Sequence, residues 1–202
     1  MKLILISSPD QVNDEVKIIN ELFELGLEYF HIRKPADTAE QVRKLIAGIE
    51  PDYYPCISLH QHHCLAEEFG IKRLHYTENE RSKLKNNTLE GLITDGFILS
   101  TSIHDLSLLA SLNEYHYVFF GPVYNSISKQ GYKSVLPPGF TLSAMKASPL
   151  IIGIGGIEAK NMDSIKKMNF DGAAILGSIW KNTEQAVENF KIIQECIKIV
   201  HT

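Results

Sequence analysis

The sequence has few cysteines, and none of them forms a paired motif. Cys56, Cys64 and Cys196 are an odd number at unrelated spacings, and no Cys-x-x-Cys occurs. A disulfide framework needs an even set of cysteines, and a structural zinc knuckle needs closely spaced ligands. The sequence therefore argues against both kinds of small domain, and we expect reduced thiols in a cytoplasmic protein.

An excess of basic residues and long apolar runs are also missing. The chain has 20 Lys and Arg residues against 24 Asp and Glu, and its formal net charge is -4. No basic surface is therefore expected for nucleic acid or anionic lipid. No run approaches the roughly 18 apolar residues of a membrane-spanning helix, and the short run at the amino terminus ends too soon for a signal peptide. We expect a small-molecule partner, and neither nucleic acid nor a membrane.

What the chain does contain is a repeated alternation of short apolar runs and helix-period segments, which is typical of βα units around a parallel sheet. Eight runs are expected to form strands: Lys2 to Ile6, Tyr29 to Arg33, Cys56 to Leu59, Arg73 to Tyr76, Gly96 to Leu99, Tyr117 to Phe120, Leu150 to Ile154 and Ala173 to Leu176. This count predicts a single-domain (β/α)8 TIM barrel over residues 1–202. At 202 residues, a second domain would leave both halves undersized.

Most of the connecting segments can hold a helix. The segment from Val12 to Leu25 places Val12, Val16, Ile19, Leu22 and Phe23 on one face, and Thr183 to Val200 repeats that pattern. The weakest connection is residues 78–95. A doubly wound open sheet is the alternative, but Ser7-Ser8-Pro9-Asp10 follows the first strand where that fold would carry a glycine-rich turn.

Glycine-bearing turns follow the last two expected strands. Gly155 and Gly156 follow the seventh strand, and Leu176, Gly177 and Ser178 follow the eighth. Without side chains in the way, backbone N–H groups can approach an anion closely, and the following helix adds a favourable dipole. The pair predicts a phosphate site; the alternative is that the glycines only make tight turns.

Two other strand ends carry cations. The hydroxyl-rich loop after strand six contains Ser126, Ser128 and Lys129, which can donate to phosphate or neutralise it; a solvated surface loop is the alternative. After strand two, alternation places His31 and Arg33 on one face of the strand. An arginine inside the barrel must meet a ligand anion or a structural carboxylate.

Histidines are concentrated near the same expected rim. They are His31, His60, His62, His63, His75 and His104. No carboxylate stands at the spacing of a zinc motif, so packing or hydrogen bonding to a substrate is favoured over zinc. One or two of these side chains could act as acid or base, because histidine titrates near neutrality.

In this order, the strand-end motifs resemble those of the thiamine-phosphate synthase and thiazole tautomerase superfamily. The similar segments are FHIRK, GIKRLHYTENE, STSIH, FGPVYNSISKQG, IIGIGGI and DGAAILGSIW. The resemblance implies a transferase of thiamine biosynthesis that couples hydroxymethylpyrimidine pyrophosphate to thiazole phosphate. It also implies a dissociative, carbocation-like step assisted by Mg2+, in which pyrophosphate leaves.

The resemblance implies roles for individual residues. Arg33, Ser102 and Lys129 would act on the pyrophosphate. The other substrate contacts would be His31, His60, Ser126, Ile127, Ser128, Gly155, Gly156, Leu176, Gly177 and Ser178. The magnesium positions fall on Gln61, where the family has aspartate, and on Glu80. Lys34 stands one residue away from the family's second cation and is expected to face away from the site.

Two other functions remain open. A thiazole tautomerase would need the phosphate grip and an acid–base residue, although that branch's histidine after strand six is Pro122 in this chain. A non-catalytic binder of thiamine precursors would keep the phosphate turns without the chemistry. A homodimer is a further expectation, because symmetric pairs are the commonest oligomers.

Overall fold

The computed structural model describes residues 1–125, 136–137, 139–143 and 149–198. Its eight strands are β1 (Lys2–Ile6), β2 (Tyr29–Ile32), β3 (Ile57–Leu59), β4 (Arg73–Tyr76), β5 (Ile98–Ile103), β6 (Tyr117–Phe120), β7 (Leu150–Ile154) and β8 (Gly172–Ile175). Neighbouring strands pair in parallel in sequence order, and β8 pairs with β1 to close the barrel. The predicted (β/α)8 fold is confirmed, and the open sheet is excluded.

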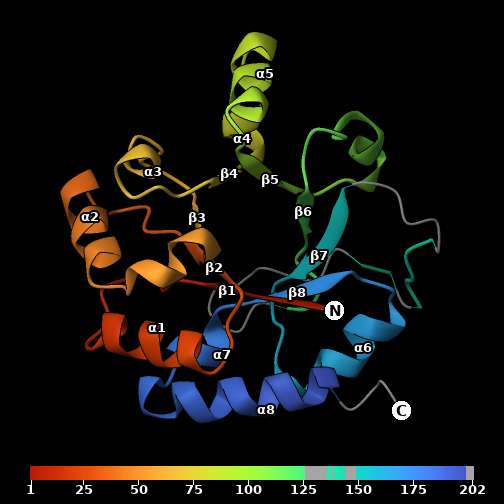
Figure 1. The fold of residues 1–202 in the computed structure, drawn as a ribbon. Helices are drawn as coiled ribbons and strands as arrows, with labels where there is room; N and C mark the ends of the chain where they lie inside the picture. Colours follow the sequence, from red (N-terminus) through yellow and green to blue (C-terminus); the bar gives the residue numbers. More distant parts are fainter. Residues whose placement is uncertain (126–135, 138, 144–148, 199–202) are drawn as a thin grey trace.

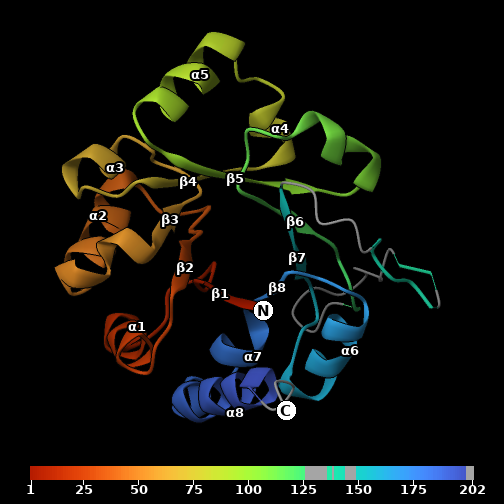
Figure 2. The ribbon, with the colours of Figure 1, turned by 45° about the vertical axis from the view of Figure 1, so that its right-hand side comes forward.

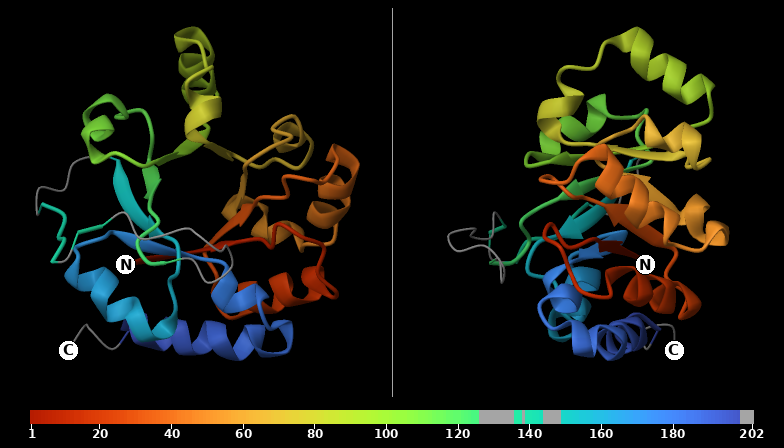
Figure 3. Two further views of the ribbon diagram at one scale, coloured as in Figure 1. Left: turned by 180° about the vertical axis from the view of Figure 1, so that it is seen from behind. Right: turned by 90° about the vertical axis from the view of Figure 1, so that its left-hand side faces the viewer.

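The helices form an outer ring around this barrel (Figure 1). They are α1 (Glu15–Glu24), α2 (Ala39–Ala47), α3 (Leu65–Glu68), α4 (Glu78–Arg81), α5 (Asn86–Thr94), α6 (Met162–Lys167), α7 (Gly177–Trp180) and α8 (Ala186–Lys198). Short 3-10 segments cover Pro51–Cys56, Leu106–Ser111, Ala159–Asn161 and Thr183–Gln185. Figures 2 and 3 show α8 lying along α1 and α6, while α5 stands out on the other side of the ring.

The largest error in the predicted strands concerns β5. The strand was expected to end at Leu99, but it continues to Ile103. Its hydroxyl residues looked like loop sequence, yet they have hydrogen-bond partners inside the barrel. The side chain of Ser100 contacts His75, and Thr101 donates to the carbonyl of Tyr76. A polar strand is stable in the barrel because its hydroxyls are hydrogen-bonded.

The predicted first helix was too long at its amino end. Asp14 has a left-handed φ of 57°, and the helix begins at Glu15. Its buried apolar residues are Ile18, Ile19, Leu22 and Phe23, whereas Val12 and Val16 are only partly buried. Val12 therefore precedes the helix, although it still packs against the core.

Cys56, Cys64 and Cys196 are all free thiols. No helix among the described residues is long and apolar enough to span a bilayer.

The inside of the barrel is divided into an apolar half and a polar half. Strands β1, β6, β7 and β8 supply a separate apolar cluster that includes Ile4, Ile6, Phe119, Ile152 and Ala174. Strands β2 to β5 instead supply buried polar side chains: His31, Ser58, His60, His75 and Ser100. Tyr117 joins the halves, since it belongs to the apolar cluster and its hydroxyl contacts His31 and Ser58.

Candidate functional site

A cavity of about 1060 Å³ lies where the carboxyl ends of the strands meet. In a (β/α)8 barrel, this rim carries the working residues. Six of the residues predicted from the sequence line the cavity: Arg33, His60, Ser102, Gly155, Leu176 and Gly177. The structure therefore brings together residues from strands β2, β3, β5, β7 and β8.

The turn after β7 requires glycine at two successive positions. Gly155 has a φ of 98° and Gly156 a φ of 64°, which L side chains rarely adopt. A Cβ on Gly155 would stand 2.8 Å from the Pro122 side chain, and one on Gly156 would stand 2.5 Å from the carbonyl oxygen of Asn125. The turn thus packs closely on the segment that follows β6.

The turn after β8 is open by comparison. A Cβ added to Gly177 would meet no atom within 4 Å, so the space in front of this residue is free for a ligand. In the described part of the chain, no carbonyl accepts from the amides of Gly155, Gly156, Gly177 or Ser178. The Ser178 hydroxyl is also buried without a partner. Donors are therefore available for an anion, and their role as phosphate ligands stays a prediction.

Arg33 lines the cavity, and its guanidinium group has no ion-pair partner among the described residues. Its backbone is held by Ser7, whose hydroxyl accepts from the Arg33 amide at 2.8 Å. Among the described residues, the guanidinium forms no salt bridge. No structural carboxylate therefore pairs with Arg33 among the described residues. Its positive charge is available to a ligand anion.

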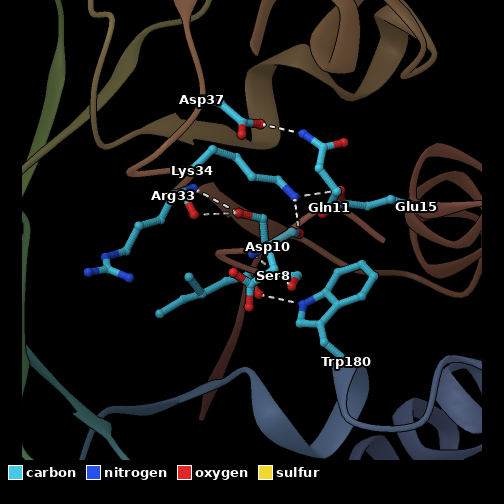
Figure 4. A network of polar contacts seen from close by, with 10 residues as sticks. Ser8, Asp10, Gln11, Glu15, Arg33, Lys34, Asp37 and Trp180 are labelled. Atoms are coloured by element: carbon cyan, nitrogen blue, oxygen red, sulfur yellow. Dashed lines mark hydrogen bonds and ion pairs between the residues drawn. The ribbon is translucent and has the colours of Figure 1, made fainter. Parts of the chain in front are cut away.

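Lys34 takes the ion pair instead and points away from Arg33 (Figure 4). Its side chain is 1% exposed, and Nζ lies 2.6 Å from the Glu15 carboxylate and 2.9 Å from the Asp10 carbonyl oxygen. Burial raises the pKa of Glu15, and the Lys34 ammonium opposes that shift. The ion pair joins the segment after β2 to helix α1, and the bond to Asp10 adds the loop after β1, which agrees with the expected outward orientation of Lys34.

The polar half of the barrel is built around three buried histidines. Nδ1 of His31 lies 2.8 Å from Nε2 of His60, and Nε2 of His31 lies 2.7 Å from the Tyr117 hydroxyl. His75 contacts the hydroxyls of Ser100 and Ser102, each at 2.9 Å. Burial lowers the pKa of all three, that of His75 to about 3, so the rings are neutral at pH 7.

Only some of the histidines predicted from the sequence line the cavity. His60 lines the cavity, whereas His31 is fully buried behind it. His104 also lines the cavity, and its Nδ1 lies 2.9 Å from the carbonyl oxygen of Gly121. His62 and His63 are not among the residues that line the cavity, and their rings contact the backbone carbonyls of Asp37 and Leu59.

Gln61 and Glu80 do not fit a magnesium site as they are placed. Neither lines the cavity, and the buried amide nitrogen of Gln61 has no partner. The Glu80 carboxylate accepts from the amide and the hydroxyl of Thr77 in a capping box that begins α4. A metal that binds two phosphate groups prefers free carboxylates, and neither position supplies one to the cavity. Binding of Mg2+ stays a prediction.

The part of the predicted loop after β6 that carries its candidate residues lies outside the described chain. Ser126, Ile127, Ser128 and Lys129 lie outside the described residues. Their assignment to substrate and to the leaving pyrophosphate therefore stays a prediction from the sequence.

Several cavity residues were not predicted. They are Asp10, Asn79, Phe119, Trp180 and Lys181. The rule that strand ends carry function could have found Asp10 and Asn79, which follow β1 and β4. Trp180 is the last residue of the short helix α7 and Lys181 follows it, and no sequence signal pointed to either residue. Trp180 donates from Nε1 to the carbonyl of Ile6, which places its indole against the apolar half.

Comparisons with known proteins agree with this arrangement. A thiamine-phosphate synthase of Leuconostoc citreum is 22% identical over 187 residues, which cover 86% of each chain. One of Salinibacter ruber is 36% identical over 78 residues, so the match spans 37% of this chain and only about a third, 34%, of that protein. The crystal structure of thiamine phosphate pyrophosphorylase from Bacteroides thetaiotaomicron superposes with a TM-score of 0.76 at 27% identity and full coverage of both chains.

The family profile described as thiamine monophosphate synthase matches residues 3–179, which is most of the chain. This match confirms the relationship predicted from the strand-end motifs and, with it, a synthase-like function in thiamine biosynthesis. The chain belongs to the thiamine monophosphate synthase family.

Proposed function

We propose that this protein joins hydroxymethylpyrimidine pyrophosphate to thiazole phosphate and releases pyrophosphate. The observation that carries this proposal is the joint lining of one cavity by the unpaired Arg33 guanidinium and by the glycine turns at Gly155 and Gly177. Two phosphorylated substrates need two anion-binding regions, and a single cavity offers both.

The chemistry asks chiefly for stabilisation of a leaving group. The bond between the pyrimidine methylene carbon and the pyrophosphate oxygen breaks, and both electrons leave with the oxygen. The thiazole nitrogen then supplies the electron pair of the new carbon–nitrogen bond. Arg33 and Ser102 stand at the cavity wall where they can stabilise negative charge on the leaving oxygens. Lys129 has the same proposed role.

A thiazole tautomerase is the second candidate, and a specific observation favours it. His60 and His104 both line the cavity, so an imidazole can reach a ligand although Pro122 replaces the histidine of that branch. Such an enzyme moves one proton between two positions of a thiazole phosphate and needs no metal. A binder without turnover would use the same phosphate turns.

One set of assays separates these functions. Purified protein is supplied with both synthase substrates and Mg2+, then with the thiazole tautomer alone, and products are followed by chromatography. We expect coupling in the first assay. Turnover of the tautomer alone would favour the isomerase. Inactivity in both, with thermal stabilisation by thiazole phosphate, would leave the binder, since ligand at ~100 times Kd adds about 2.7 kcal/mol to stability.

We also propose the partners, the location and the oligomeric state of the protein. The partners would be the small phosphorylated thiazole and pyrimidine substrates. We further propose a cytoplasmic location, because the three cysteines are free thiols. We also propose a homodimer, because symmetric pairs are the commonest oligomers.

A further inference from the structure

His60 lines the cavity and carries a buried hydrogen-bonding atom that has no partner among the described residues. The residue is 5% exposed and lines the cavity, and its Nδ1 has no partner in the described structure. A buried polar atom without a partner costs free energy that a ligand can recover. Such an atom therefore indicates a contact that is completed when substrate binds.

The other nitrogen of His60 belongs to a chain of hydrogen bonds. Nε2 contacts His31 at 2.8 Å, and the far side of His31 contacts the Tyr117 hydroxyl at 2.7 Å. The hydroxyl oxygen of Ser58 lies 3.4 Å from the hydroxyl oxygen of Tyr117. All four side chains are buried. The chain runs from the middle of the barrel to the cavity.

The chemistry of these groups gives the chain a direction. A phenolic hydroxyl is a stronger donor than an imidazole N–H, and an imidazole nitrogen is a stronger acceptor than a phenolic oxygen. Tyr117 thus donates to Nε2 of His31, which places the His31 proton on Nδ1. His31 then donates to Nε2 of His60, and the single proton of neutral His60 must be on Nδ1. Each group holds one proton, and the chain has no net charge.

We propose that Tyr117 and His31 hold His60 as the Nδ1–H tautomer, and that this N–H donates to a ring nitrogen of the heterocyclic substrate. Tyr117 and His31 are positioning residues, and His60 is the contact. This inference rests on the proposed function for the substrate class. A neutral donor suits an uncharged ring nitrogen, while the anionic groups have Arg33 and the glycine turns. The aromatic ring of Phe119 also lines the cavity, with its centroid 6.4 Å from that of His60.

A metal centre fits the same histidines less well. Ring nitrogens of His31, His60 and His75 lie within 4.8 Å of one another. However, the rings of His60 and His75 are stacked 4.0 Å apart at 23°, so their in-plane lone pairs do not converge on one point. Both nitrogens of His75 already contact serine hydroxyls. A metal would have to displace these bonds.

The tautomer can be observed directly, without substrate. Protein labelled with 15N histidine is studied by NMR, and the His60 signals are identified by their loss in His60→Asn. We expect wild-type His60 to carry its proton on Nδ1, and Tyr117→Phe to shift it toward Nε2. Tyr29→Phe is the control, because it removes a barrel hydroxyl that contacts Lys2 and no histidine. A wild-type His60 protonated on Nε2 would overturn the inference.

Binding of unphosphorylated hydroxymethylpyrimidine, measured by calorimetry, tests the recognition step. His60→Gln keeps a polar atom toward His31 but loses the cavity donor, and should bind about tenfold more weakly. His60→Asn can place an amide N–H near the former Nδ1 and should lose less. Equal affinity in His60→Gln and wild type, or no binding by wild type, would refute the contact. An Nδ1–H tautomer with pyrimidine binding but no coupling would instead refute only the proposed function.

Discussion

Arg33 and Lys34 are neighbours in the sequence, and their side chains point in opposite directions (Figure 4). Arg33 enters the cavity, whereas Lys34 is buried against Glu15 on the helix side of the barrel. Both residues lie in the segment that follows β2, which ends at Ile32. One cation is therefore available for substrate, and the other serves the fold.

Arg33→Met should weaken ligand binding and leave the fold intact. The change removes a charge that no described carboxylate neutralises, so binding of inorganic pyrophosphate should fall about tenfold or more. The free energy of unfolding should change by less than about 1 kcal/mol. Calorimetry and urea unfolding measure the two quantities, and Lys17→Met, on the exposed side of α1, is the charge-matched control. Unchanged pyrophosphate affinity would contradict the role of Arg33.

Lys34→Met should have the reverse effect. Breaking a buried ion pair leaves the Glu15 carboxylate uncompensated and should cost about 3–5 kcal/mol in urea unfolding. Adding Glu15→Leu should recover much of that loss, because it removes the stranded charge. If the double variant were as unstable as Lys34→Met alone, the pair would not explain the destabilisation.

Gly177→Asp should abolish binding of thiazole phosphate. The new carboxylate would occupy the open space in front of residue 177 and repel the phosphate. Gly91→Asp adds the same charge to α5, also where nothing lies within 4 Å, and should bind as wild type. Calorimetry with both variants makes the comparison, and normal affinity in Gly177→Asp would place the phosphate elsewhere.

Gln61→Asp should raise any magnesium-dependent coupling rate. A carboxylate is a far better ligand for Mg2+ than an amide, and it would restore the residue type of the family. The rate is measured as Mg2+ is titrated, with EDTA-treated protein as the zero point. No gain at saturating Mg2+ would remove position 61 from the metal site.

Stability should decline below about pH 6.5. Burial holds the pKa of His31 and His75 well below 6.5, so on acidification the unfolded chain takes up protons that the folded protein does not. Each such histidine lowers the free energy of unfolding by about 1.4 kcal/mol per pH unit, from about pH 6.5 down toward its folded pKa. Urea unfolding between pH 7.5 and 5 tests this, and His75→Gln should reduce the slope by about one proton. A flat profile would show that the histidines are protonated in the fold.

The sequence predicted the architecture well because a βα repeat is a local signal. Apolar runs such as Tyr117 to Phe120 gave their strands without error. The prediction for β5 ended too early because its hydroxyl residues do not look like strand sequence. Their hydrogen-bond partners lie in β4 and are distant in sequence. Trp180 and Lys181 were missed for a related reason, because only the closed barrel brings them to the cavity.

The site was predictable where the backbone conformation requires one residue type, as the positive φ angles at Gly155 and Gly156 require glycine. It was less predictable where a side chain has two plausible tasks. Glu80 matched a metal position by alignment, yet Thr77 uses its carboxylate as a helix cap. Pattern alone cannot separate these tasks, since both call for an acidic residue after a strand.

The split interior of the barrel also restricts how a guest molecule can be seated. Wall positions from Ile6, Phe119 and Ile154 offer no hydrogen bonds, while those from Arg33, His60 and Ser102 do. A planar heterocycle bound in the reverse orientation would place its ring heteroatoms against apolar side chains, where they would have no hydrogen-bond partners. The two walls of the barrel thus favour one orientation of a heterocyclic ligand over its reverse.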